Sequence, residues 1–161
     1  MKFAAACFIP VLALAVQPPP ATETTTKTQD AWSSLKRLAG NWEAGGANRF
    51  SLVEDLQGKA YVRRNHADYP GVVHDDLMIV YREGDRVRAD YYDNEGHVIR
   101  YTVDGGDEIR MVSDVTAGAP RYRLTYYFSV QDKVDIRFEI APPGQAEAFK
   151  LYLAGTARRL K

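Results

Sequence analysis

The residues best suited to acid–base chemistry gather between positions 91 and 101, in the stretch YYDNEGHVIRY. Asp93 and His97 lie close together in it, and Arg100 follows them. A carboxylate that orients a histidine can make that histidine a general base, and the same pairing activates nucleophiles. An aspartate and a histidine facing each other beside a turn also form an ordinary cross-strand hydrogen bond. The residue types alone therefore leave a catalytic and a structural role open.

The residues DNEG, 93–96, predict the turn that positions this pair. Asn94 and Glu95 suit the centre of a type I turn, and Gly96 suits the left-handed position after it, which makes a three-residue hairpin loop. Asp93 then faces His97, and their side of the sheet also holds Val87, Ala89, Tyr91, Ile99, Tyr101 and Val103. The other side places Arg100 opposite Asp90, so we interpret Arg100 as charged cover of a solvated face.

Other arrangements for chemistry are less specific. The densest cluster of possible metal ligands is His66, Asp68, His74, Asp75 and Asp76, but its spacing matches no known zinc pattern. No G-x-S-x-G motif marks a nucleophilic serine, and the one cysteine, Cys7, lies in the apolar N-terminal segment. We therefore predict neither a metal site nor a cofactor, and we assign no residue a catalytic role.

The elements that must position these residues are strands. From Asn41 onward, apolar residues recur with a period of two, in segments separated by short turns that contain glycine or aspartate. The pattern predicts about ten strands, and a meander this long avoids exposed edges by closing into an antiparallel up-and-down β-barrel. A β-sandwich is the alternative. The only predicted helix is a short one before the first strand, where Trp32, Leu35 and Leu38 follow helical spacing.

A second hairpin predicts an aromatic interior. With VQD, 130–132, as its loop, the inner face would hold Tyr122, Leu124, Tyr126 and Phe128 opposite Val134, Ile136, Phe138 and Ile140. Two other segments lack this clean alternation. DDLMIVY is apolar on both faces, so we expect its outer side to be covered by the helix that contains Trp32. YVRRNHADYP is polar on both faces, so either it is a solvated strand or some of Arg63, Arg64, Asn65 and His66 point inward.

The predicted inner face suits a ligand. Tyrosines supply apolar walls and hydroxyl groups, which together fit an amphipathic or aromatic molecule. The alternative is that the rings only fill the barrel. The candidate ligand-binding residues are Tyr91, Tyr101, Tyr122, Tyr126, His97 and Asp93, with Arg64 and His66 as polar anchors.

The N-terminal region predicts export. Residues 1–16 resemble a signal peptide, because Lys2 precedes an apolar run, Phe3 to Val16, that ends in small residues and is too short to span a bilayer. Residues 17–30 are rich in proline and threonine and predict a disordered linker, so the folded domain would be 31–161. We expect a secreted or periplasmic protein. Basic and acidic residues both number 21, which gives no electrostatic case for nucleic acid or anionic membranes.

Several of these segments together resemble the lipocalin-like (calycin) barrels. In that superfamily a G-x-W motif opens the first strand, here Gly40 and Trp42, and an arginine near the last strand packs across the tryptophan, here Arg158 or Arg159 in GTARRL. The segments RRNHADYP, HDDLMIVY, YYDNEGHVIRY, GAPRYRLTY and FEIAPPG look like secreted bacterial lipocalin-like domains of unassigned function, over about residues 35–160. The resemblance implies the fold and no reaction. Some ten-stranded relatives bind haem through a histidine, but this chain has no histidine after His97.

We therefore expect an exported barrel that binds a small hydrophobic or amphipathic molecule. Two alternatives remain at this point. One is an enzyme that uses Asp93 and His97 at the barrel mouth. The other is an envelope module that recognises a partner protein through an exposed outer face, which a bare apolar patch outside DDLMIVY would favour. The sequence does not predict an oligomeric state.

Overall fold

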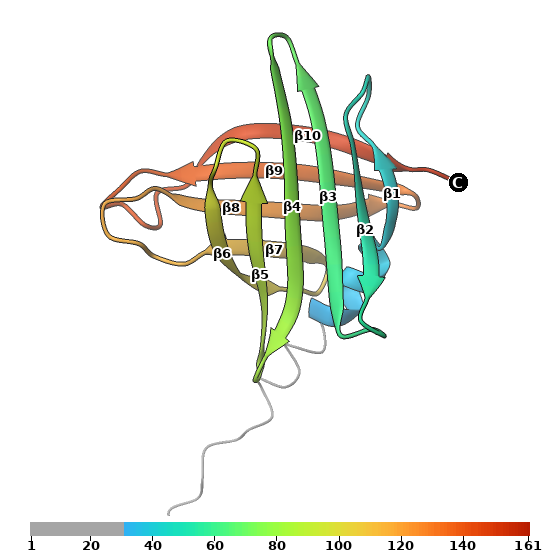
Figure 1. The fold of residues 1–161 in the computed structure, drawn as a ribbon, viewed down its shortest axis with the longest axis horizontal. Coiled ribbons are helices and arrows are strands. Elements are labelled where there is room, and N and C mark those ends of the chain that lie inside the picture. The colour runs from blue at the N-terminus through green and yellow to red at the C-terminus, as the bar shows by residue number, and fades with distance from the viewer. Residues whose placement is uncertain (1–30) are drawn as a thin grey trace, which may run out of the picture.

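The structure is a computed structural model and describes residues 31–161. The predicted signal peptide and linker, residues 1–30, lie outside the described residues. A short helix spans residues 31–38 and leads into ten strands (Figure 1). The strands are β1 (Gly40–Glu43), β2 (Arg49–Asp55), β3 (Ala60–Tyr69), β4 (Val72–Glu83), β5 (Arg86–Asp93), β6 (Val98–Asp104), β7 (Glu108–Ser113), β8 (Arg121–Val130), β9 (Lys133–Ala141) and β10 (Lys150–Arg159).

The strands form one closed antiparallel barrel, in which each strand pairs with its neighbours in the chain and β1 pairs with β10. The all-β up-and-down barrel expected from the sequence is confirmed, and the sandwich alternative is wrong. The closing seam is short, because β1 meets β10 only through the pairs Trp42–Arg159 and Glu43–Arg158. The barrel is thus closed by strand pairing at one end of the seam.

The hairpin of β5 and β6 has the predicted register. Tyr91 pairs with Ile99, Ala89 with Tyr101, and Val87 with Val103. Gly96 has a φ of 91°, the left-handed conformation that the loop requires of it. On the outer side, Arg100 donates from Nε to Asp90 Oδ1 over 3.1 Å. Arg100 therefore belongs to a charged ladder on the barrel surface.

The hairpin of β8 and β9 corrects the predicted loop. Val130 pairs with Lys133, so the turn contains only Gln131 and Asp132, and the register shifts between Tyr127 and Val130. Asp132 adopts a left-handed φ of 60°, which aspartate tolerates better than most residues. Beyond the shift, the predicted pairs Tyr122–Ile140, Leu124–Phe138 and Tyr126–Ile136 are present. The extra residue is absorbed by a bulge, so the inner face farther along is unchanged.

The helix closes one end of the barrel and does not cover the outside of β4, contrary to expectation. Ala31, Leu35 and Leu38 are fully buried in the core. Ser34 Oγ donates to the carbonyl of Gly106, in the β6–β7 turn, over 3.1 Å and accepts its amide over 2.9 Å. Three apolar side chains on one face bury more surface inside the barrel end than on a curved outer wall. We call this the helix end, and the opposite end of the barrel the mouth.

A clamp joins the helix to the last strand. Trp42 donates from Nε1 to the carbonyl of Leu38 over 2.8 Å. Arg159 places its guanidinium 4.3 Å from the centre of the Trp42 ring and donates to the carbonyls of Ala39 and Arg37. Of the two arginines suggested by the family resemblance, Arg159 is therefore the one over the indole, and Arg158 is exposed. Gly40 has a φ of 136°, and a Cβ there would collide with the Arg159 guanidinium.

Candidate functional site

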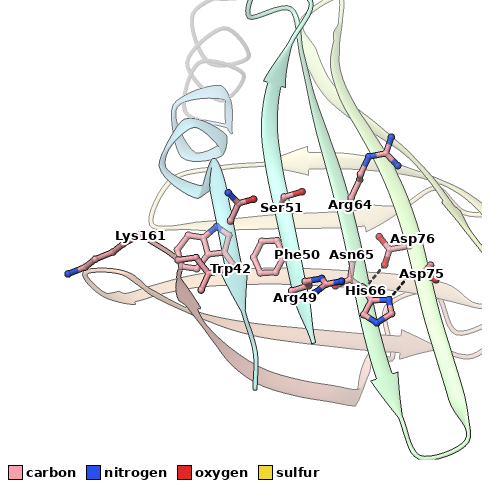
Figure 2. A pocket seen from close by; sticks show the side chains of 12 residues that line it. Trp42, Arg49, Phe50, Ser51, Arg64, Asn65, His66, Asp75, Asp76 and Lys161 are labelled. Atoms are coloured by element: carbon pink, nitrogen blue, oxygen red, sulfur yellow. Dashed lines mark hydrogen bonds and ion pairs between the residues drawn. The ribbon is translucent and has the colours of Figure 1, made fainter. Parts of the chain in front are cut away.

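The strand β3 divides the candidate polar residues between two faces. Pairing with β4 joins Arg63 to Met78 and Asn65 to Asp76, and these four side chains point into the barrel. Arg64 and His66 have the opposite parity and lie on the outer surface. They line an open groove of about 700 Å³ along β1–β4 and the chain's C-terminal residues (Figure 2). There His66 Nδ1 lies 2.7 Å from Asp75 Oδ1. The structure thus separates Arg64 and His66 from the tyrosines.

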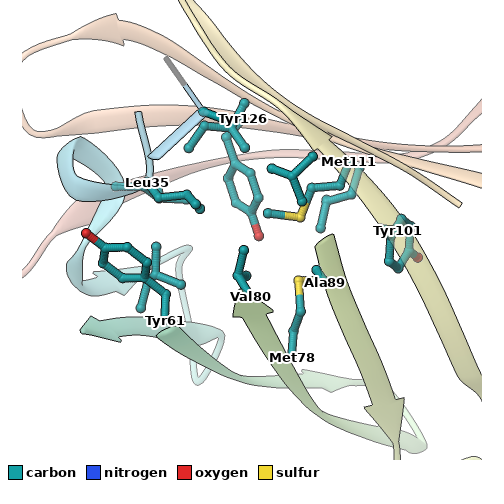
Figure 3. Packing of buried hydrophobic residues seen from close by; sticks show 14 of the residues in the cluster. Leu35, Tyr61, Met78, Val80, Ala89, Tyr101, Met111 and Tyr126 are labelled. Carbon is teal, nitrogen blue, oxygen red and sulfur yellow. The ribbon is translucent and has the colours of Figure 1, made fainter. Parts of the chain in front are cut away.

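Two of the four candidate tyrosines belong to the packed core. Tyr126 is fully buried and Tyr101 nearly so, among Leu35, Met78, Val80 and Met111 (Figure 3). Burial raises the pKa of both phenols, so both stay neutral and act only through a protonated hydroxyl. A ligand could reach these rings only by displacing packed side chains. The helix half of the interior is therefore filled.

The mouth has a different inner wall. Tyr122 and Phe138 stack with ring centres 5.9 Å apart, and Tyr152 meets the edge of Phe138 at 6.1 Å. These rings are only partly covered: Tyr122 and Phe138 are half-buried and Tyr152 is 73% exposed, and the neighbouring Leu153 is 45% exposed. Tyr91 is half-buried and stands edge-on to Tyr101 at 6.3 Å. Tyr122, Phe138 and Tyr152 thus form an aromatic ledge on the inner face of the barrel wall, and this ledge is partly exposed to solvent. We call Tyr91, Ile99, Tyr122, Phe138, Tyr152 and Leu153 the mouth residues.

A chain of hydrogen bonds crosses the rim of the mouth. His97 Nδ1 lies 2.8 Å from Asp93 Oδ2, and the His97 amide donates to Asp93 Oδ1 over 2.8 Å. The hydroxyl of Tyr91 donates to Asp93 Oδ2 over 3.1 Å. His74 Nε2 lies 3.1 Å from that same hydroxyl, and its Nδ1 lies 3.0 Å from Glu95 Oε1. The predicted proximity of Asp93 and His97 is present, and it is part of a longer network.

Two groups of this network, Asp93 and Tyr91, have shifted pKa values. Burial alone would raise the pKa of Asp93, but hydrogen bonds from His97 and Tyr91 outweigh it and hold the pKa below its ordinary value of 3.8. Burial, together with Asp76 and Asp93, raises the pKa of Tyr91 well above its usual range. At neutral pH Asp93 is therefore an ionised acceptor and Tyr91 a neutral donor. Both Asp93 oxygens already accept hydrogen bonds from the chain, as expected of a group that organises the rim.

Beneath the rim lies a buried ion pair. Arg63 Nη1 donates to Asp76 Oδ1, and the two side chains are only 7% and 4% exposed. Asn65 Nδ2 donates to Asp76 Oδ2 over 3.0 Å. Burial alone would lower the pKa of Arg63, but Tyr126 and Asp76 raise it, so the guanidinium stays charged. Arg63 and the Tyr126 hydroxyl interact with each other in the barrel centre, so Tyr126 belongs to the same buried polar cluster as Arg63 and Asp76.

Sequence reasoning named His74 and Asp76 only as possible metal ligands, and of the polar residues of β3 it chose Arg64 and His66, and not Arg63 and Asn65, as the inward anchors. The turn YPGV could have predicted which of these side chains point inward, because Tyr69 pairs with Val72 across Pro70 and Gly71. A two-residue hairpin loop fixes the parity of both strands behind it. Counting back from that turn places His74, Asp76, Asn65 and Arg63 on one face. Tyr152 could not be found in this way, because the register of β9 and β10 shifts between Leu151 and Leu153.

Comparisons with known proteins give no further assignment. No protein-family model matches the chain, and no curated protein matches it significantly. Within residues 31–161, no cluster of three or more histidine, cysteine, aspartate or glutamate side chains is arranged to hold a metal ion. The same residues include no helix that is long and apolar enough to cross a membrane. What the chain can do must therefore be argued from the geometry of its own barrel.

Proposed function

We propose that this protein is an exported lipocalin-like barrel that binds a small hydrophobic or amphipathic molecule at its mouth. The observation that supports this most directly is the exposure of the aromatic ledge formed by Tyr122, Phe138 and Tyr152. Burying an apolar side chain gains about 1.5–3 kcal/mol, so an inner wall left half open has free energy to gain from a ligand. The G-x-W motif and its stacked arginine support the lipocalin-like assignment.

The position of the ledge restricts the ligand. The helix half of the barrel is filled, so the ligand must be short enough to stay in the mouth half. Its flat or apolar part would lie on Tyr122 and Phe138. Its polar part would meet the Tyr91 and His74 groups at the rim. An aromatic molecule with one polar end fits both requirements.

Binding of an uncharged solvatochromic dye, Nile red, tests the site. We expect the dye to bind the folded protein and to become fluorescent, and Phe138→Ala to weaken binding at least tenfold because the ledge loses its central ring. Tyr92→Ala is the matched control, since Tyr92 is a partly exposed aromatic residue on the outer wall of β5. Equal weakening by both substitutions, or no binding to the unaltered protein, contradicts the proposal. Native mass spectrometry of protein purified from the producing cell would then identify a retained ligand.

An enzymatic role for Asp93 and His97 has less support. The Asp93 carboxylate accepts from the amides of Glu95 and His97 and from Tyr91, which are bonds that shape the hairpin loop. An enzyme would lose turnover in His97→Ala while the fold stayed intact. Loss of Nile red binding in His97→Ala without any change in folding would instead point to the ligand site. We therefore place this pair in the binding rim.

A partner-binding role has one specific observation in its favour. The outer wall of β2–β6 has two rows of partly exposed apolar residues: Val53, Val62 and Ile79 in one, and Leu77, Tyr92 and Val98 in the other. An apolar patch of this kind can mark a protein interface. A photo-crosslinking side chain at Ile79 should then capture one defined envelope protein in exporting cells. The same side chain at exposed Val115 is the control, and equal labelling at both positions contradicts this role.

The proposed export has its own test. Residues 1–16 would be removed during secretion, leaving a chain that begins with the proline- and threonine-rich linker. N-terminal sequencing of the protein recovered outside the cytoplasm should therefore begin near residue 17. An intact Met1 in that fraction would contradict the proposal.

A further inference from the structure

The groove on the outside of the barrel has no part in the proposed function. It runs along β1–β4, and its volume of about 700 Å³ lies in the range of small-molecule sites. Its lining includes Arg49, Ser51, Arg64, His66 and Asp75, whose positions in their strands direct them outward (Figure 2). We call these five the groove residues. The groove thus holds both polar anchors that the sequence suggested for the barrel interior.

The two arginines of the groove have no counterion. Within the part of the chain that the structure describes, neither guanidinium forms a hydrogen bond, an ion pair or a contact with an aromatic ring, and both side chains are exposed. Arg64 faces Ser51 in β2 and Leu77 in β4, which are both uncharged. Arg49 faces Glu43 in β1 without forming an ion pair with it. Two positive charges therefore stand unpaired beside each other.

Arginines elsewhere on the outer wall are paired with carboxylates. Arg100 donates to Asp90 across β5 and β6, and Arg123 forms two hydrogen bonds of 2.7 Å with Glu139 across β8 and β9. Opposite charges that face each other on neighbouring strands stabilise a sheet. Since an arginine in a protein does not lose its proton, an unpaired one keeps its full charge and five N–H donors. The groove arginines depart from this pairing and remain able to bind an anion.

The carboxylates that line the groove are already engaged. Asp75 Oδ1 lies 2.7 Å from His66 Nδ1. Asp76 points into the barrel, where it binds Arg63. Lys161 also lines the groove and adds another positive charge. The chain as a whole has equal numbers of acidic and basic residues, so the positive charge of the groove is a local feature.

The arginines are close enough to bind one ligand together. Arg49 pairs with His66, and Arg64 lies two residues before His66 in β3, so the arginines are diagonal neighbours. Diagonal neighbours in a sheet lie about 7–8 Å apart, which is within reach of long side chains. Ser51, which faces Arg64, offers a hydroxyl donor in the same place. The groove therefore presents two guanidinium groups and a hydroxyl to a single anion.

We propose that the groove binds a phosphate monoester of a small organic molecule. The planar guanidinium group matches the geometry of phosphate oxygens and donates two hydrogen bonds to them. A phosphate monoester carries a charge of about −1.5 to −2 at pH 7, which two unpaired arginines balance, whereas a carboxylate brings a single charge. The groove extends beyond these arginines to the exposed side chain of Leu160, which leaves room for the organic part of the ester.

Isothermal titration calorimetry of the exported protein with glucose 6-phosphate tests the site. We expect a dissociation constant below about 1 mM at low salt, and binding weakened at least about tenfold by Arg49→Gln and by Arg64→Gln, since each removes charged hydrogen bonds to the phosphate. Arg100→Gln is the matched control, because it removes the same charge from an arginine that is already paired. Equal weakening by Arg100→Gln, or equal binding of glucose, overturns the proposal.

The ester belongs either to a soluble molecule or to a lipid headgroup, and vesicles distinguish these sources. Phosphatidic acid carries a phosphate monoester, so co-sedimentation with vesicles that contain it, and not with phosphatidylcholine vesicles, would identify a lipid, provided that Arg64→Gln abolishes it. Binding of glucose 6-phosphate without co-sedimentation would identify a soluble ester. Binding of neither probe overturns the proposal.

The groove and the mouth are tested separately, because they lie on opposite faces of the barrel wall. A variant that combines Arg49→Gln with Arg64→Gln should lose glucose 6-phosphate binding and keep Nile red binding. Phe138→Ala should do the reverse, since its ring belongs to the inner ledge. Loss of both ligands in the double arginine variant contradicts a separate site in the groove.

Discussion

The two ends of this barrel are built from the same strands and differ in almost every physical property. At the helix end, Leu35, Leu38, Trp42 and Tyr126 are buried, and the seam is joined by the Arg159 clamp. At the mouth, Tyr152 and Leu153 of the inner wall face solvent, and titratable groups line the rim. The difference follows from the helix, whose buried side chains fill only one end of the barrel. One half is therefore packed, and the other half keeps part of its inner wall exposed.

The largest expected effect is at the closed end. Trp42→Ala should destabilise the protein by about 4 kcal/mol, because it removes a buried ring together with its stacking on Phe50 and its contact with Arg159. Urea unfolding followed by circular dichroism measures this change. A loss below about 1 kcal/mol would mean that the helix end is not the stabilising half.

The buried ion pair between the two halves comes next. Asp76→Asn should cost about 3 kcal/mol, since it leaves the Arg63 charge buried without its counterion. The double variant Arg63→Met with Asp76→Leu should recover most of that stability, because it removes both charges from the interior. Urea unfolding of Arg63→Met, Asp76→Leu and the double variant gives the coupling energy. Additive losses would contradict an interaction between the two side chains.

A smaller, pH-dependent effect is expected at the rim. Asp93→Asn should cost about 2 kcal/mol at pH 7, because the amide cannot replace both charged hydrogen bonds to Tyr91 and His97. The folded pKa of Asp93 is lowered, so its contribution is fully present above the ordinary value of 3.8 and is lost as the pH falls through the folded pKa. Unfolding curves of the two proteins should therefore converge in strong acid. A difference that persists unchanged below pH 3 would show that charge is not its cause.

The smallest effect is expected on the open ledge. Tyr152→Ala should change the free energy of unfolding by less than about 0.5 kcal/mol, because the ring is mostly exposed. The same variant should weaken Nile red binding, since Tyr152 forms the edge of the ledge. Urea unfolding and dye titration of one sample separate the two results. A large loss of stability with unchanged dye binding would reverse the proposed division between the ends.

Most of the barrel could be predicted because alternation with a period of two leaves few alternatives. The turn DNEG was sufficient to place Asp93 opposite His97 and Arg100 on the outer wall, and the structure has that register. The loop at 130–132 was wrong by one residue, since Asp132 can take a left-handed conformation that shortens the turn. Where a turn contains no glycine, the conformation of its other residues therefore decides the strand register, and the sequence predicts that register less well.

The site was harder to predict, because it depends on how far each wall is covered. Nothing in the pattern distinguishes Tyr126, which is core, from Tyr122, which is mouth, although they are four residues apart on the same face. Their difference arises from the helix, whose buried side chains fill only one end. The helix itself was expected on the outer wall of the barrel. An apolar helix face indicates that the helix packs against another surface, but it does not indicate which surface that is.

The Arg159 clamp also has a consequence for how the chain folds. Its guanidinium binds carbonyls of Arg37 and Ala39, residues more than a hundred positions earlier. Contacts between such distant residues form late, since a long loop must be ordered before they contribute. The pairing of β1 with β10 can form only when residues from both ends of the domain have been synthesised and can meet. The seam between β1 and β10 therefore joins the two ends of the domain and depends on both of them.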